Sequence, residues 1–346
     1  MAKWYESPKV DQGIVISSRV RLARNLKKYP FPIRMKEEEA EAVIQQVKDA
    51  VINDRTPLGQ SFHFYQVDTM PAGEKRMMVE SHVISPVLLQ QQKPCAVLVK
   101  DDETVSIMIN EEDHIRIQTI FPGEDIDQAW DLADKLDNLI EETVEYAYNE
   151  HIGYITACPT NMGTGLRASF MVHVPSLEAT GQINNLSQAL SKFGITVRGI
   201  YGEGSASLGG IYQVSNQITL GQSEEEILKN LKNAIHLVKD QEQKVRKAIR
   251  ERDEVGYEDR IYRALGVLQN ARKISAQEAA DCLSLLREGA QEGVLAWKAS
   301  KPMYELFIAI QPCHMQKDGQ KMAAERDVAS STGPPSSGSA LWTPSR

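Results

Sequence analysis

Two short apolar runs flank a brief polar turn in residues 95–110, which read CAVLVKDDETVSIMIN. A connection as short as DDET joins neighbouring antiparallel strands, because a parallel crossover needs roughly a dozen residues or more. Other segments rich in β-branched residues are separated by glycine-rich turns: IVISSRVRL (14–22), GYITACP (153–159), ASFMVHVPSL (168–177) and GGIYQVSN (209–216). The sequence therefore predicts an α+β fold with a largely antiparallel sheet flanked by helices, rather than a regular βαβ alternation.

Helical patterns fill the remaining segments. Residues 36–52 and 124–148 have amphipathic periodicity, and Ser223 with Glu226 forms a capping box that opens a long helix. Helical sequence continues to about residue 300, interrupted at Gly256 and at a second capping box, Ser275 with Glu278. We expect a first domain over 1–250, a small all-helical domain over 251–328, and a disordered Ser/Gly/Pro-rich tail over 329–346.

Composition excludes several classes of protein. Of the 346 residues, 42% are hydrophobic and 25% are charged, which is ordinary for a globular protein with a sizeable core. A net charge of −8 argues against direct binding of nucleic acid by bulk charge. No apolar run approaches the roughly 20 residues of a membrane helix, so no membrane partner is expected. The N-terminus lacks a signal-peptide core and the four cysteines form no C-x-x-C pair, which predicts a cytoplasmic protein.

Arginines recur at strand ends and tight turns. Arg19 and Arg21 are two residues apart on one predicted strand and so project from the same face, while Arg116, Arg167 and Arg198 lie at strand ends or beside glycine turns. Two arginines on a strand also suit a solvent-facing surface. Guanidinium groups bind phosphate bidentately, and five of them would neutralise a nucleoside triphosphate. The chain has no P-loop and no protein-kinase signature, so we predict a phosphate site built from arginine side chains.

Carboxylates follow the second strand of the hairpin. In NEEDHIRIQ (110–118), Glu111, Glu112 and Asp113 continue the strand, so that neighbouring side chains point to opposite faces and cannot all enter one pocket. Glu203 lies in the turn YGEGS, where spacing alone favours a solvated residue. Carboxylates beside bound phosphate become useful when the acceptor is a guanidinium, which offers a fork of donors but is a poor nucleophile until a proton is removed.

Two further residues allow either a structural or a functional interpretation. Cys158, in TACPTNMGTG, is either a small core residue or a thiol that contacts a cationic substrate. His82, in ESHVISP, is structural by default, but its ring is also able to stack on a base.

Four blocks together resemble one enzyme family. SSRVRLARN, NEEDHIR, CPTNMGTGLRAS and RGIYGEGSASLGGIYQVSN are similar to the catalytic domain of the ATP:guanidino phosphotransferases, or phosphagen kinases, over about residues 10–245. The resemblance implies a phosphagen-kinase-like fold that uses ATP and Mg²⁺, with a small all-helical domain following it in this chain. It implies these site residues: nucleotide-phosphate arginines Arg19, Arg21, Arg116, Arg167 and Arg198; His82 near the adenine; Glu112 and Glu203 on the guanidinium; and Cys158 beside it.

The arrangement of the chain refines this expectation. Family members that act on small guanidines carry a helical domain ahead of the catalytic one, whereas here the arginine strand begins within the first twenty residues, so we expect that domain to be absent. With a helical module after residue 250, the chain resembles the bacterial members that phosphorylate arginines in proteins. That branch implies homodimers, a zinc-containing activator protein, a stress-response repressor as a substrate, and delivery of marked proteins to a Clp ATPase/protease.

Three further expectations concern regulation, metal binding and alternative functions. Arg326 and Asp327, in AERDVASS, match the first half of a regulatory phosphoarginine-binding motif whose second half is missing, so an incomplete regulatory pocket is expected. No carboxylate cage is evident, so Mg²⁺ is expected on the nucleotide's own oxygens and no metal on the protein. The alternatives to a protein-arginine kinase are a kinase of free arginine or another small guanidine, and a non-catalytic adaptor for a protease.

Overall fold

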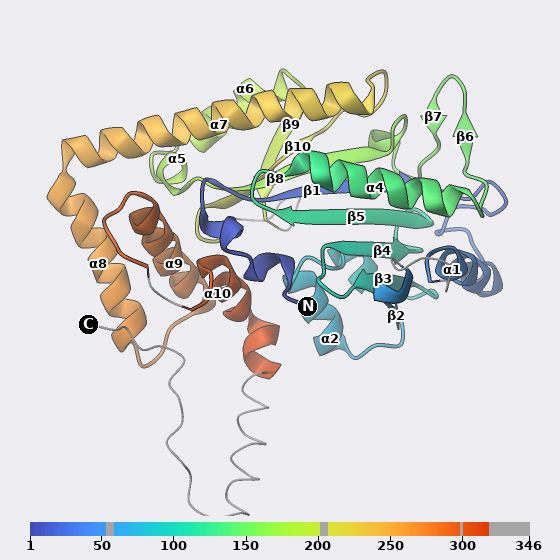
Figure 1. Ribbon diagram of the computed structural model, residues 1–346, viewed down its shortest axis with the longest axis horizontal. Helices are drawn as coiled ribbons and strands as arrows, with labels where there is room; N and C mark the ends of the chain where they lie inside the picture. Colours follow the sequence, from blue (N-terminus) through green and yellow to red (C-terminus); the bar gives the residue numbers. More distant parts are fainter. Residues whose placement is uncertain (53–58, 201–206, 298–299, 318–346) are drawn as a thin grey trace, which may run out of the picture.

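The computed structural model describes residues 1–52, 59–200, 207–297 and 300–317. In this part of the chain, one eight-stranded antiparallel sheet forms the centre of the molecule (Figure 1). Across the sheet, its strands are β2 (Phe62–Gln66), β3 (Ala96–Lys100), β4 (Val105–Ile109), β5 (Ile115–Pro122), β1 (Val15–Arg24), β8 (Leu166–His173), β10 (Ile211–Asn216) and β9 (Ile195–Gly199). A separate hairpin pairs β6 (Tyr148–Asn149) with β7 (Gly153–Tyr154).

Helices cover both faces of the sheet (Figure 1). They are α1 (Glu37–Val51), α2 (Ala72–Glu80), α3 (Pro86–Leu89), α4 (Ile126–Glu141), α5 (Pro175–Ala179), α6 (Ile183–Ser191), α7 (Glu224–Arg252), α8 (Glu254–Asn270), α9 (Ala276–Gln291) and α10 (Met303–Ala309). Short 3₁₀ turns are η1 (Trp4–Glu6), η2 (Pro8–Asp11), η3 (Gly59–Ser61) and η4 (Pro159–Asn161). The predicted α+β class with a largely antiparallel sheet is confirmed. No described helix is both long and apolar enough to cross a membrane.

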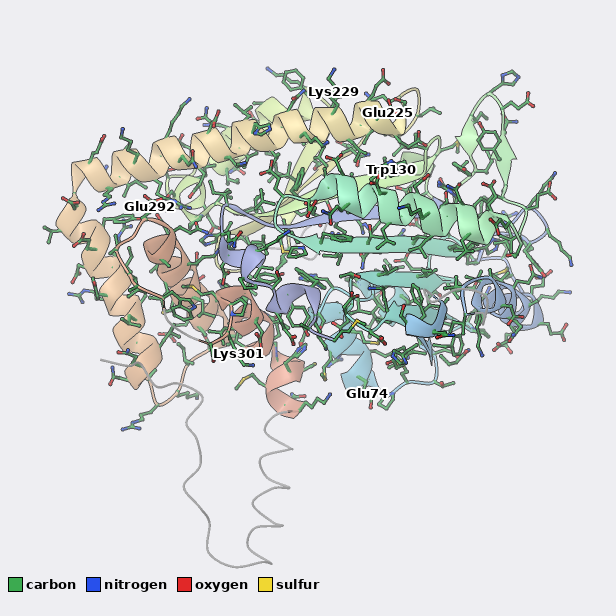
Figure 2. All side chains as sticks on the ribbon, viewed as in Figure 1. Glu74, Trp130, Glu225, Lys229, Glu292 and Lys301 are labelled. Atoms are coloured by element: carbon green, nitrogen blue, oxygen red, sulfur yellow. The ribbon has the colours of Figure 1, made fainter. Side chains whose placement is uncertain are left out.

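Alternating residues give the sheet two different faces. On β1 and β8, Val20, Leu22, Ala168 and Phe170 belong to the main hydrophobic core, which α1, α4 and α7 cover. The outer surface of α7 carries charged side chains such as Glu225 and Lys229, which point away from the sheet (Figure 2). The intervening strand residues point to the opposite face, whose middle is polar. The hydrophobic core therefore covers one face of the sheet. The polar centre of the opposite face is available for a functional site.

The predicted capping boxes differ in detail. Ser223 and Glu226 exchange both hydrogen bonds at the start of α7, as expected. At α9 the Ser275 hydroxyl accepts from the Glu278 backbone N–H. The break between α7 and α8 falls at Asp253, whose carboxylate accepts from the Gly256 N–H at 2.9 Å. Gly256 therefore lies inside the first turn of α8, and the expectation that it interrupts the helix was wrong by one turn.

Two predicted elements end early. The helix expected over 124–148 stops at Glu141, and its last residues enter the β6–β7 hairpin. The strand expected over 153–159 is reduced to Gly153–Tyr154, because residues 155–158 form a loop bonded to the turn after β4. Residues 110–114 were expected to continue β4, but they form the turn between β4 and β5, with Asn110 in the left-handed region at φ 59°.

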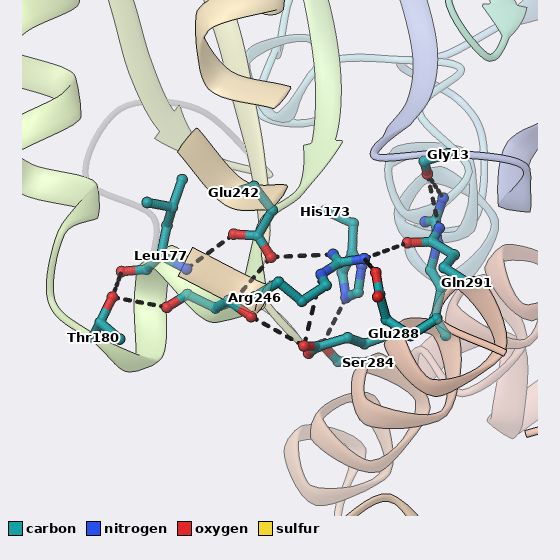
Figure 3. Close-up of polar contacts among 12 residues, drawn as sticks. Gly13, His173, Leu177, Thr180, Glu242, Arg246, Ser284, Glu288 and Gln291 are labelled. Atoms are coloured by element: carbon teal, nitrogen blue, oxygen red, sulfur yellow. Dashed lines mark hydrogen bonds and ion pairs between the residues drawn. The ribbon is translucent and has the colours of Figure 1, made fainter. Parts of the chain in front are cut away.

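A buried polar network joins the C-terminal helices to the rest of the chain (Figure 3). Arg246 of α7 donates to Glu242 at 3.1 Å, and its Nε lies 3.7 Å from the carboxylate of Glu288 in α9. Glu242 also accepts from the backbone N–H groups of Ser176 and Leu177. Every carboxylate in this network has a cation or donor beside it, which is the condition for burying charge. The domain division at residue 250 stays a prediction.

Candidate active site

A cavity of ≈ 450 Å³ lies on the sheet face opposite α4 and α7. All five arginines singled out from the sequence line it: Arg19, Arg21, Arg116, Arg167 and Arg198. They converge because adjacent antiparallel strands bring same-face residues level with one another. Arg21 of β1 lies directly opposite Arg167 of β8, and Arg198 of β9 lies opposite Gln213 of β10.

This arrangement concentrates positive charge. Like charges directly opposite on neighbouring strands repel one another. Burial, together with Arg116 and Arg167 nearby, lowers the pKa of Arg19 to about 10 and holds the pKa of Arg21 well below its usual value. The Arg21 Nε is buried and has no hydrogen-bond partner among the described residues. The face is therefore built for a polyanion that supplies several acceptor oxygens.

The turn at residues 111–113 distributes its three carboxylates to different places. Glu111 is fully buried, lies 2.7 Å from Arg116 Nη1 and accepts from the Ser85 hydroxyl. Glu112 lines the cavity with 42% of its side chain exposed, and its carboxylate lies 3.5 Å from Arg116 Nη2. Burial raises the pKa of Glu112, and Arg116 opposes that rise. The prediction that the three carboxylates cannot share one pocket is confirmed, although a turn rather than strand pleating separates them.

Asp113 holds the cysteine loop against this turn. Its Oδ1 accepts from Asn25 Nδ2 at 2.7 Å and from the Ala157 N–H at 2.6 Å, and the Asn25 carbonyl oxygen Oδ1 accepts from the His114 N–H at 2.9 Å. Cys158, which follows Ala157 in the chain, is partly exposed in the cavity, with its Sγ 3.0 Å from Thr160 Oγ1. Glu112 and Cys158 are thus positioned by their chain neighbours Asp113 and Ala157, which are hydrogen-bonded to each other.

His82 also lines the cavity. It follows α2 in the left-handed region at φ 62°, which is unfavourable for a residue with a Cβ. Burial, with a smaller contribution from Arg19, lowers its pKa to about 3, so the ring is neutral at ordinary pH. Its Nε2 lies 3.0 Å from the hydroxyl of Tyr304. The ring is therefore structurally bonded and also lines the cavity, while its stacking on a base stays a prediction.

Several polar residues of the cavity wall were not predicted from the sequence. Ser85, Gln118, Gln213 and Ser215 all line the cavity. Gln118 follows Arg116 by two residues, and Ser215 follows Gln213 by two, so period-two spacing was a usable signal. Gln213 also accepts from Arg19 Nη2 at 2.6 Å.

Four predictions fall on residues outside the described part of the chain. Glu203, Arg326, Asp327 and the tail at 329–346 are all among them. Within the described ranges, no cluster of three or more His, Cys, Asp or Glu side chains is arranged to hold a metal ion.

Family models match two successive parts of the chain. The model described as ATP:guanido phosphotransferase, C-terminal catalytic domain, matches residues 42–245. The model described as Protein-arginine kinase McsB C-terminal domain matches residues 254–332. The chain belongs to the ATP:guanido phosphotransferase family and, within that family of phosphotransferases, to the protein-arginine kinases.

Curated relatives support this assignment over nearly the full length. A protein named protein-arginine kinase from Caldanaerobacter subterraneus subsp. tengcongensis is 47% identical over 320 residues, covering 92% of this chain and 95% of the relative. One of the same name from Bacillus subtilis is 43% identical over 330 residues, covering 95% of this chain and 91% of the relative.

Solved structures show the same fold. A lombricine kinase aligns with a TM-score of 0.59 at 24% identity, covering 70% of this chain and 69% of that structure. A duplicated taurocyamine kinase from Schistosoma mansoni aligns equally well, with 68% of this chain and 34% of that structure covered.

Proposed function

We propose that this protein transfers the γ-phosphoryl group of ATP to arginine side chains of other proteins. The observation that carries the proposal is a single cavity that combines five arginines with Glu112 and Cys158. The shared name of the curated relatives, protein-arginine kinase, supports an arginine side chain as the acceptor. ATP, when bound, supplies the phosphoryl group.

The arginine face forms the phosphate end of this site. Arg19, Arg21, Arg167 and Arg198 bind the phosphate oxygens and stabilise the negative charge of the group in transfer. Arg116 lies between the two ends, because it contacts both Glu111 and Glu112. Anionic oxygens that enter the cavity relieve the remaining repulsion among these side chains, so the free protein is already arranged for the charged transition state. His82 packs near the base.

The acceptor end consists of Glu112 and Cys158, and Glu203 is proposed to join them. Glu112 orients the guanidinium and accepts the proton that the attacking nitrogen loses as its bond to phosphorus forms. Its raised pKa makes it a better proton acceptor than an ordinary glutamate. Cys158 contacts the guanidinium from the other side. Mg²⁺ would be held mainly by oxygens of the nucleotide.

Mapping of the product tests this proposal. The protein is incubated with ATP, Mg²⁺ and an arginine-rich protein, and the acid-labile phosphate is assigned by mass spectrometry. We expect phosphate on arginine. Turnover of free arginine without any protein product would favour the small-guanidine alternative, and the absence of any ATP-dependent transfer would favour the adaptor alternative.

The wider setting is proposed from the same family resemblance. Phosphorylation would mark misfolded proteins for a Clp ATPase/protease and inactivate a stress-response repressor in the cytoplasm, with a zinc-containing activator protein as a partner. Loss of the incomplete regulatory pair, Arg326 and Asp327, would leave the basal activity unchanged. A homodimer would use the helical module, where Val255 and Tyr262, exposed by 80% and 52%, lie seven residues apart on one face of α8. Sedimentation of Tyr262→Glu against the unmodified protein tests that surface.

A further inference from the structure

Helix α10 and the residues after it are bonded to the wall of the cavity that contains His82. Tyr304 of α10 is 1% exposed, and its hydroxyl lies 3.0 Å from His82 Nε2, a contact that spans 222 positions of the chain. Trp4 packs beside both, with ring centroids 5.6 Å from Tyr304 and 6.3 Å from His82. The position of the His82 ring is therefore set by parts of the chain remote from α2.

A second attachment lies directly beside the first. The carboxylate of Glu80 accepts from the backbone N–H of Cys313 at 3.0 Å and of His314 at 3.2 Å, and it lies 2.8 Å from His314 Nδ1. The Ser81 hydroxyl lies 3.2 Å from His314 Nε2. Three consecutive residues at the end of α2, Glu80 to His82, are thus each bonded to the C-terminal helical segment.

The hydrogen bonds around Tyr304 run in one direction. The hydroxyl lies 2.9 Å from Met171 Sδ, which can only accept, and this leaves the hydroxyl oxygen to accept from His82 Nε2–H. On the other side, the backbone carbonyl of His82 accepts from Gln118 Nε2 at 2.8 Å, and Gln118 itself lines the cavity. A left-handed residue such as His82 keeps its conformation only where surrounding contacts hold it, and these contacts supply that restraint.

We propose that Tyr304 is a positioning residue for nucleotide binding, which holds the His82 ring at the base end of the cavity. The proposal rests on the proposed function, in which that cavity binds ATP. It makes the C-terminal helical module part of the nucleotide site, because α10 supplies the hydroxyl that orients a cavity side chain. Arg19, which is proposed to bind phosphate, interacts electrostatically with both Tyr304 and His82, so we expect loss of the hydroxyl to lower nucleotide affinity.

The test is Tyr304→Phe in the full chain, which keeps the ring in its apolar cluster and removes only the hydroxyl. We expect the Kd for ATP, measured by calorimetry, to rise about fivefold, the change for one hydrogen bond of ordinary strength. The KM for the protein acceptor and the kcat at saturating ATP stay within about twofold of the unmodified protein.

Tyr257→Phe is the matched control. It removes the hydroxyl of another buried tyrosine of the same helical module, one that bonds Glu288 at 3.0 Å and does not line the ATP cavity. We expect it to leave the Kd for ATP unchanged even if the thermal midpoint falls. A loss of ATP affinity as large in Tyr257→Phe as in Tyr304→Phe would overturn the proposal, because general loosening of the module would then explain both.

A double-mutant cycle with His82→Ala tests whether Tyr304 acts on ATP binding through His82. If Tyr304 acts through His82, Tyr304→Phe has no further effect on the Kd for ATP in the His82→Ala background. A further fivefold rise there would overturn the proposal. If Tyr304→Phe does not fold, Glu80→Ala replaces it, because this variant loosens the second attachment. An unchanged Kd for ATP in a folded Glu80→Ala would also count against the proposal. Failure of the unmodified protein to bind ATP would instead overturn the proposed function.

Discussion

At the scale of single residues, neighbours in the chain have unlike environments. Glu111 is buried against Arg116, Glu112 is half exposed in the cavity, and Asp113 is buried against Asn25 and Ala157 N–H. The three carboxylates are chemically similar, so their different positions, rather than their identity, decide which one is available to a substrate.

Glu112→Gln tests the acceptor end of the site. The substitution keeps the size of the side chain but removes the proton acceptor, so we expect kcat to fall at least about a hundredfold, with ATP binding retained. Steady-state assays of arginine phosphorylation on a protein substrate measure this. Glu142→Gln, at an exposed glutamate after α4, is the control and stays fully active. A near-normal kcat in Glu112→Gln would show that Glu112 is not the proton acceptor.

Cys158 differs from the other cysteines in its accessibility. Cys95, Cys282 and Cys313 are buried, whereas Cys158 is partly exposed in the cavity. We expect iodoacetamide to alkylate Cys158 first and to abolish phosphorylation in step with that modification, because the added group fills the acceptor end. Peptide mapping over a time course checks this, with Cys158→Ser as the control. Equal labelling of the buried cysteines would contradict it.

At the scale of elements, two strands and one tight turn align the arginines. The register that places Arg21 opposite Arg167 begins next to Gly165, which has φ +65°. A Cβ on Gly165 would lie 2.6 Å from the Ala23 carbonyl oxygen, which is backbone and cannot move aside cheaply. This glycine is therefore needed both for its left-handed conformation and for the close approach of β1 and β8.

Gly165→Ala should destabilise the protein and weaken nucleotide binding. We expect a loss of about 1–3 kcal/mol in the free energy of unfolding, because both strain and a backbone clash are introduced. Urea titration measures the loss. Gly266→Ala is the matched control: Gly266 lies within α8, nothing lies within 4 Å of an added Cβ, and we expect a gain of about 0.5–1 kcal/mol. Equal effects from the two variants would contradict the argument.

At the scale of the whole molecule, buried neutral histidines join distant parts of the chain. His82 contacts Tyr304, His114 accepts from the Leu26 N–H at 3.0 Å, and His173 lies 2.7 Å from the Ser284 hydroxyl. Burial lowers the pKa of each: to about 3 for His82, below the usual value for His114, and well below it for His173, where Arg287 and Arg246 add to the effect.

These histidines should make the fold sensitive to acid. The folded state keeps them neutral, while the unfolded chain takes up protons below about pH 6.5, so stability is lost as pH falls through that value. Each contributes at most about 1.4 kcal/mol per pH unit. Urea midpoints at pH 7.5 and 5.5 measure the slope. His173→Gln should flatten it, whereas the exposed His236→Asn should not. The same slope in His173→Gln would contradict the assignment.

The sequence by itself determined the antiparallel sheet, the family and most of the cavity. Period-two spacing placed Arg19 and Arg21 on one face, and the four family blocks identified Arg116, Arg167, Arg198, Glu112 and Cys158 before any contact was known. The strand spacing and the turns are local features, because strand alternation and short turns depend on residues close together in the chain.

Only the tertiary structure decided what each of these side chains touches. The turn that separates Glu111, Glu112 and Asp113 was misread as strand, since the partners that shape it, Asn25 and Ala157, are 88 and 44 positions away. The bond between His82 and Tyr304 spans 222 positions, and no local pattern encodes it. Hydrogen bonds to buried groups are chosen by packing after distant segments meet, and this is why they appear only in the folded chain.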